Sequence, residues 1–281
     1  MKTKKMILSI IGSLLILIIS QVTAQLLASA LLSIKVPEFV CNGLAGILYI
    51  VFAFYLIRLL CKKYIKEDMS DYKIPKCKIE IRWLIIAIVL PILISACYLL
   101  FLDGSLKQNE ISMQSKLSML STGIFFIGFG AGIVEEMVFR GIMMTVIEKR
   151  FHKKIAIIVP SLLFGLVHII GMKMDILSAI LVIFAGTMVG IMFSLIASET
   201  KSIWNSAIVH AVWNIVIVGG IISIGTEFDE YSLYSYILNT KSFILTGGEF
   251  GIESSMIAVL GYTVVSVLVL VISRKKNSSK S

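Results

Sequence analysis

The chain is short of charge, proline and repeated segments. Only 15% of its 281 residues are charged, whereas a soluble protein has about 25%. Hydrophobic residues make up 58%, the mean hydropathy is +0.96, and there are only four prolines. Internal repeats, low-complexity stretches and a polar module are lacking. This composition excludes an ordinary soluble enzyme and is typical of an integral membrane protein.

Signatures of metal and redox sites are also lacking. The zinc motif H-E-x-x-H does not occur. The four cysteines are not spaced as C-x-x-C, and we interpret them as packing residues: Cys41, Cys61, Cys77 and Cys97.

Apolar runs long enough to cross a bilayer, about 17–25 residues, dominate the chain. We therefore predict an all-α fold, a polytopic transmembrane bundle of about eight helices in the cell membrane. The runs lie near residues 6–32, 39–60, 83–101, 121–147, 154–172, 176–197, 203–224 and 254–273.

Basic residues are distributed unequally between the loops on the two sides of the predicted bundle. Of the 26 Lys and Arg residues, 20 lie in the segments that share a side with the N-terminus, and five lie in the opposite segments. This asymmetry predicts that both termini are cytoplasmic, and it explains the net charge of +9 by topology signals rather than by a binding patch for nucleic acid. The expected partners are membrane lipids and a peptide or protein substrate. The inner loop from Cys61 to Arg82 is expected to be an amphipathic segment on the lipid surface or a solvated loop.

The N-terminus resembles a signal peptide, with a possible cleavage site at Ala24. Because the apolar character continues through Leu32, an uncleaved first helix is favoured. We divide the chain into N-terminal helices with a cytoplasmic loop (1–115), a core (116–222), and an outer acidic loop, last helix and basic tail (223–281). Whether the acidic loop, residues 226–253, contributes to recognition stays open.

The fourth helix carries three charges inside an apolar run. Each would cost several kcal/mol unless it were paired or faced a wet cavity. On a helix, Glu136 and Arg140 are four residues apart, share a face and can pair, whereas Glu135 points about 100° away. Glu135 therefore lacks a local partner and is the candidate for a chemical role.

Glycines predict close helix packing around these charges, because small residues let backbones approach. The fourth helix should therefore be central, and the sixth helix should offer a second close-packing face. The glycines are Gly123, Gly128, Gly130 and Gly132 in the fourth helix and Gly186 and Gly190 in the sixth.

Two of the three histidines lie within apolar helices. At a rise of 1.5 Å per residue, Glu135 and His168 each lie about 21 Å from the basic turn of residues 149–154. Asn214 follows His210 by one helical turn and lies about 20 Å from Lys201. The spacing predicts that four polar side chains from three helices meet inside the membrane.

Three ordered motifs carry a family resemblance. They are Glu135-Glu136-x-x-x-Arg140, Phe164-x-x-x-His168 and His210-x-x-x-Asn214. Together they resemble the CPBP family of intramembrane proteases, which includes type II CAAX prenyl endopeptidases and bacteriocin-processing or Abi proteins. The resemblance covers roughly residues 118–222.

The resemblance implies a role for each matched residue. The general base falls on Glu135, the water-orienting histidine on His168, and the oxyanion-stabilising pair on His210 and Asn214. Glu136 and Arg140 match supporting positions.

Two mechanisms remain open at this point. In one, Glu135 takes a proton from water, and two fixed donors stabilise the oxyanion, each typically contributing about 3–4 kcal/mol. In the other, Glu135, His168 and His210 hold Zn²⁺, since a carboxylate and two imidazoles are an acceptable ligand set. The sequence leaves the cofactor undetermined.

The predicted function is an intramembrane endopeptidase that acts on membrane-associated peptides or proteins. The Lys- and Ile-rich composition favours a bacterial source, and hence maturation of a bacteriocin or signal peptide, or self-immunity. The alternative is a non-proteolytic membrane protein, namely an immunity protein, a scaffold or a transporter, because such proteins also bury Glu, His and Arg. Internal inverted repeats, which would favour a transporter, are not seen.

Overall fold

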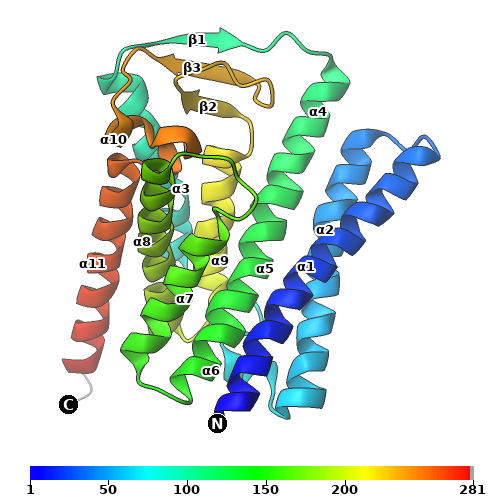
Figure 1. Cartoon of the computed structure of the whole chain (residues 1–281), viewed down its shortest axis with the longest axis vertical. Helices are drawn as coiled ribbons and strands as arrows, with labels where there is room; N and C mark the ends of the chain where they lie inside the picture. Colours follow the sequence, from blue (N-terminus) through cyan, green and yellow to red (C-terminus); the bar gives the residue numbers. More distant parts are fainter. Residues whose placement is uncertain (279–281) are drawn as a thin grey trace.

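The computed structural model describes residues 1–278 and shows a bundle of helices with a small sheet at one end (Figure 1). Helix α1 begins, and α11 ends, at the end of the bundle opposite the sheet. The helices are α1 (Thr3–Ser33), α2 (Glu38–Leu59), α3 (Ile81–Phe101), α4 (Met113–Ser121), α5 (Gly132–Glu136), α6 (Met144–Glu148), α7 (Lys153–Val167), α8 (Ile176–Thr200), α9 (Ile203–Trp213), α10 (Phe243–Thr246) and α11 (Met256–Ser278).

Shorter 3-10 and π-helical segments lie between them or extend them. The π-helical segments are η1 (Leu60–Ile65), η3 (Thr122–Ala131), η4 (Met137–Met143) and η5 (Asn214–Val218). The 3-10 segments are η2 (Met69–Tyr72), η6 (Gly248–Phe250) and η7 (Ile252–Ser254).

Six helices within residues 1–278 are long and apolar enough to cross a membrane. One of them is the continuous run Met113–Glu148, which contains α4, η3, α5, η4 and α6. The predicted all-α polytopic bundle is confirmed. Two of the eight expected helices are shorter than predicted, because α7 ends at Val167 and the run that begins at Ile203 ends at Val218. The cytoplasmic location of the termini stays a prediction, and Lys280 of the basic tail lies outside the described residues.

The sheet was not predicted. It has the order β1-β3-β2, from β1 (Gly104–Gln108), β2 (Ile222–Gly225) and β3 (Tyr234–Leu238). Strand β3 pairs antiparallel with β1 and parallel with β2. Strand β1 lies in the polar segment before α4 and is stabilised by its pairing with β3, more than a hundred residues away.

The inner loop differs from the expected lipid-surface segment. Tyr72 and Ile74 are 0% and 4% exposed, because the loop packs into the protein core. The indole Nε1 of Trp204 donates to the Pro75 carbonyl at 2.7 Å, which fixes the loop to the start of α9. Cys77 of the same loop is exposed, so the packing interpretation is wrong for this cysteine.

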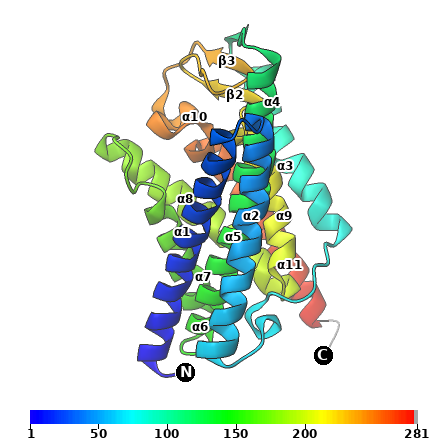
Figure 2. The ribbon, with the colours of Figure 1, turned by 90° about the vertical axis from the view of Figure 1, so that its right-hand side faces the viewer.

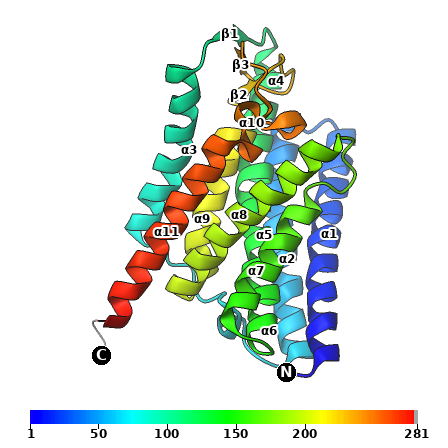
Figure 3. The same ribbon diagram turned by 60° about the vertical axis from the view of Figure 1, so that its left-hand side comes forward.

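The predicted close packing around glycine is confirmed. A Cβ at Gly132 would lie 2.8 Å from the backbone of Ala211, and one at Gly186 would lie 2.7 Å from Cα of Gly165. The first contact brings α5 against α9, and the second brings α7 against α8. Figure 2 shows α1 and α2 side by side, and Figure 3 shows α3 and α11 on the other side of α8 and α9. Helices α5, α7 and α9 are thereby held close together near the middle of the bundle.

Candidate active site

The two carboxylates lie on a short α-helical segment between π-helical turns. Helix α5 carries Glu135 and Glu136 and is flanked by η3 and η4 within one continuous helix. Such π-helical turns are frequent at functional sites. The Glu135 side chain is 22% exposed, whereas that of Glu136 is fully buried. The adjacent carboxylates therefore have different environments, as the helix geometry predicted.

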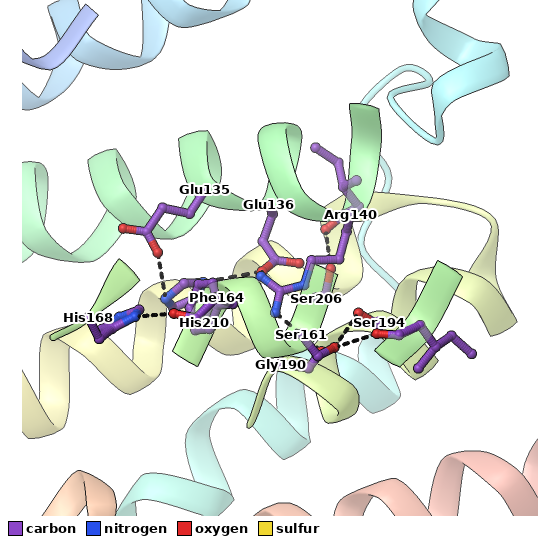
Figure 4. Close-up of polar contacts among 12 residues, drawn as sticks. Glu135, Glu136, Arg140, Ser161, Phe164, His168, Gly190, Ser194, Ser206 and His210 are labelled. Atoms are coloured by element: carbon purple, nitrogen blue, oxygen red, sulfur yellow. Dashed lines mark hydrogen bonds and ion pairs between the residues drawn. The ribbon is translucent and has the colours of Figure 1, made fainter. Parts of the chain in front are cut away.

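Glu136 and Arg140 form the predicted ion pair (Figure 4). The guanidinium donates to Glu136 Oε1 at 2.8 Å and to the Gly190 carbonyl at 3.2 Å. It also lies 4.4 Å from the ring centre of Phe164 and 5.2 Å from that of Phe193. Arg140 thus joins the fourth spanning helix to α7 and α8.

The His210 imidazole lies between the two carboxylates. Its Nδ1 is 3.3 Å from Glu136 Oε1, and its Nε2 is 3.8 Å from Glu135 Oε2. The ring stacks on Phe193 with centroids 4.6 Å apart, which fixes its plane. Because Glu136 faces one nitrogen, the other nitrogen is presented on the side of Glu135.

His168 is held by a contact that orients its ring. Its Nδ1 lies 2.6 Å from the Phe164 carbonyl oxygen. A carbonyl only accepts hydrogen bonds, so Nδ1 carries the proton and Nε2 of the neutral ring is an acceptor. This arrangement suits the water-orienting role that the resemblance implies.

The position of His168 corrects the expected helix of residues 154–172. His168 is the residue after the last helical one of α7, so it is not within the helix. The helix stops because Gly171 adopts a left-handed φ of +80° and Asp175 already caps the start of α8. His168 therefore lies where the chain turns between two packed helices.

Asn214 is the first residue of η5, and its amide is partly used. The Nδ2 group donates to the Ile127 carbonyl at 3.0 Å. An amide nitrogen carries two hydrogens, so one remains available to a ligand.

These residues meet at one cavity. His168, His210 and Asn214 line a space of about 50 Å³ whose other walls include Phe164 and Phe193. Glu135 reaches this group through its contact with His210. The structure thus brings together the four side chains that the sequence placed at one level.

One residue of the cavity was missed by the sequence analysis. Glu253, in η7 just before α11, lines the same space and accepts from the Trp213 indole at 3.3 Å. Burial raises the pKa of the Glu253 carboxyl. Its only sequence signal was its position as the last acidic residue of the outer loop, directly before an apolar helix.

The alternative zinc set is not assembled as a metal site among the described residues. Within residues 1–278, no group of three His, Cys, Asp or Glu side chains is arranged to hold a metal ion. The Nδ1 atoms of His168 and His210 face protein oxygens, of Phe164 and Glu136, so Nε2 is the nitrogen of each ring that is left for another partner.

The fold and these contacts define a helical bundle, with helices long and apolar enough to cross a membrane, that holds a carboxylate–imidazole site. Residues 117–216 match the protein-family model described as type II CAAX prenyl endopeptidase Rce1-like. This match covers all three motifs and confirms, for this part of the chain, the resemblance to the CPBP family; it supports an intramembrane CAAX-type endopeptidase. A search of the curated proteins found no match to the chain. Glu253 lies outside the matched residues.

Proposed function

We propose that the protein is an intramembrane endopeptidase in which Glu135 and His168 activate a water molecule. The observation that carries the proposal is the placement of His210, with Nε2 3.8 Å from Glu135, on the wall of the cavity that His168 also lines. A base, an acceptor that can orient water and a further ring nitrogen are thus adjacent. The match to a protease family supports the same reaction class.

The reaction follows from these groups. The water donates one hydrogen bond to His168 Nε2 and its other proton to Glu135, and its oxygen attacks the peptide carbonyl carbon. The charge that develops on the carbonyl oxygen is stabilised by hydrogen bonds from the free amide hydrogen of Asn214 and from Nε2–H of His210. Because Nδ1 of His210 already donates to Glu136, the ring donates from Nε2 as an imidazolium. When the C–N bond breaks, the proton held by Glu135 passes to the leaving amine.

The location of the site restricts the substrate. Glu135 lies on a helix that is long and apolar enough to cross a membrane, and His210 and Asn214 lie on the shorter apolar run Ile203–Val218. We propose that the protein is a multi-pass protein of the cell membrane. A helical peptide bond is shielded by its own hydrogen bonds, so a segment must be extended to reach Glu135. We therefore propose membrane-associated peptides, or helix ends that unwind easily, with Gly or Pro close to the cut.

The biological role that we propose is bacterial peptide maturation or self-immunity. The test is comparative peptidomics of membranes from cells that carry the native chain or Glu135→Gln. The matched control is Glu227→Gln, which removes an exposed carboxylate of the outer loop. Uncut precursors should accumulate only with Glu135→Gln. A phenotype that survives this substitution, with unchanged peptides, would favour a binding role such as an immunity protein or scaffold.

A further inference from the structure

The cavity is negatively charged and lacks a free cation. Among its described lining residues, Glu253 is the only carboxylate and no Lys or Arg occurs. Glu135 and Glu136 lie just behind His210, and the one nearby guanidinium, Arg140, is already paired with Glu136. With His168 neutral and His210 as the imidazolium that the oxyanion contact requires, three carboxylates face two cations, and one carboxylate is left without a counter-charge.

The fold does not depend on the Glu253 carboxylate. The backbone carbonyl of Glu253 accepts from the Tyr262 hydroxyl at 3.0 Å, and Ser254 Oγ donates to the Gly247 carbonyl at 2.6 Å. These bonds hold the segment without the Glu253 side chain. The carboxylate itself has one hydrogen bond, from Trp213 to Oε2, and its Oε1 has no partner within residues 1–278. The Glu253 residue is thus held in place, but its Oε1 atom is left free to accept a hydrogen bond.

The cavity volume limits what can reach this acceptor. At about 50 Å³ it exceeds the roughly 30 Å³ that one water occupies in the liquid, and the space suits a water molecule beside a group as small as an ammonium. The apolar walls, which include Phe250 and Tyr262, offer no competing hydrogen bonds from their rings. The free oxygen is thus accessible to a small donor.

We propose that Glu253 determines the specificity of this site by binding a primary ammonium group of the substrate, from a lysine side chain or a chain N-terminus. The inference rests on the proposed endopeptidase activity and adds the chemical class of its substrates. A carboxylate between apolar walls is costly without a counter-charge, and the substrate supplies the cation that the protein lacks. The loss of contact with water that makes an ionised carboxylate costly also raises the pKa of the Glu253 carboxyl.

A purely structural role makes a different prediction. If Glu253 only accepts the hydrogen bond of Trp213, then Glu253→Gln keeps its function, because the amide oxygen accepts equally and the side chain has the same shape. If the charge binds an ammonium group, the same substitution removes the preference for substrates that carry a free ammonium group, while the protein remains folded.

The experiment uses purified full-length protein in detergent and internally quenched peptides. The peptides share an apolar segment with a Gly-containing end, and a lysine is moved along the residues near the cut. Each is paired with a peptide that has Nε-acetyl-lysine at the same place, and with an N-terminally acetylated version. The acetyl groups remove each charge separately and so distinguish the two ammonium sources.

We expect the native protein to cleave one lysine position, or the free N-terminus, with about tenfold or greater kcat/KM than its acetylated partner, a modest value for a charge pair away from water. In Glu253→Gln this preference should fall to within about twofold, whereas Glu227→Gln keeps it. The inference is overturned if Glu253→Gln keeps the same preference, or if the native protein shows no preference.

Failure of the proposed activity is distinguished by two further readouts. Acetylated peptides should be cut equally by the native protein and Glu253→Gln, so loss of cutting in the native protein would contradict the endopeptidase itself. Binding of the same peptides by fluorescence anisotropy to His168→Gln needs no turnover. Equal affinity for lysine and acetyl-lysine peptides there would overturn the inference independently of catalysis.

Discussion

His210 Nδ1 lies 3.3 Å from Oε1 of Glu136, the oxygen that also accepts from Arg140. The residue beside the proposed base therefore does not react but orients the imidazole that faces the base. Glu136 Oε2 and Arg140 Nε have no partner within the described residues, so the pair has one direct hydrogen bond and not the bidentate geometry. The burial of the Glu136–Arg140 pair is more readily explained by its role in positioning His210 than by a contribution to the stability of the fold.

Arg140→Ala should lower stability strongly. It leaves Glu136 as an unpaired charge in an apolar core, a change that commonly costs about 3–5 kcal/mol. Thermal melts and the folded yield in detergent measure the effect, with Glu135→Gln as the matched substitution. Equal yields and equal melting temperatures for the two variants would show that the ion pair has no structural role.

Gly165→Ala should destabilise the contact of α7 with α8. The added Cβ would meet the Ile183 carbonyl oxygen at 2.5 Å, and overpacking of this kind typically costs about 1–3 kcal/mol. It should also reduce activity, because displacement of α7 moves His168. The control is Gly225→Ala, where a Cβ has no neighbour within 4 Å. If the two variants have the same melting temperature, α7 and α8 are not packed as described.

Glu67→Gln should have a small, pH-dependent effect. Lys149 donates a hydrogen bond to Glu67 and lowers the pKa of its carboxyl below the usual 4.5. A lowered folded-state pKa gives stability that is present above the unfolded-state pKa and is lost as the pH falls through the folded-state pKa.

Because the Glu67 side chain is 37% exposed, solvent screening limits the effect to about 0–1 kcal/mol. Melting temperatures of both proteins in detergent measure it. The difference should be present at neutral pH and vanish in acid. A difference that persists or grows in acid would exclude the pair as its cause.

His168→Ala should abolish peptide hydrolysis and leave the protein folded. The ring makes one hydrogen bond, to the Phe164 carbonyl at the end of a helix, so its removal affects chemistry more than packing. Cleavage assays together with melts in detergent test this expectation. Cleavage at the native rate would remove His168 from the mechanism.

Features encoded locally could be predicted from the sequence. The i, i+4 spacing of Glu136 and Arg140 predicted their ion pair, and length with hydropathy predicted the spanning helices. Helix rise placed Glu135, His168, His210 and Asn214 at one level, although the cap of α7 at His168 was not foreseen.

Features that depend on distant contacts could not be predicted. Strand β1 pairs with β3 across more than a hundred residues, and the loop beside Tyr72 is tied by Lys73 to Thr145 of α6 and to Ile203 of α9. Glu253 reaches the cavity only because α11 packs against α8 and brings the preceding segment with it. No local pattern marks such a residue.

The central claim is that Glu135 is the base of a peptide hydrolase. The most direct test reconstitutes the native protein and Glu135→Gln in liposomes at equal folded amounts and measures cleavage of membrane-inserted peptides by mass spectrometry. The account predicts that the native protein cuts near the membrane interface and that Glu135→Gln retains no more than a few per cent of this activity, since loss of general-base catalysis alone costs about 10²–10⁴-fold. Cleavage by Glu135→Gln at a rate near that of the native protein would contradict it.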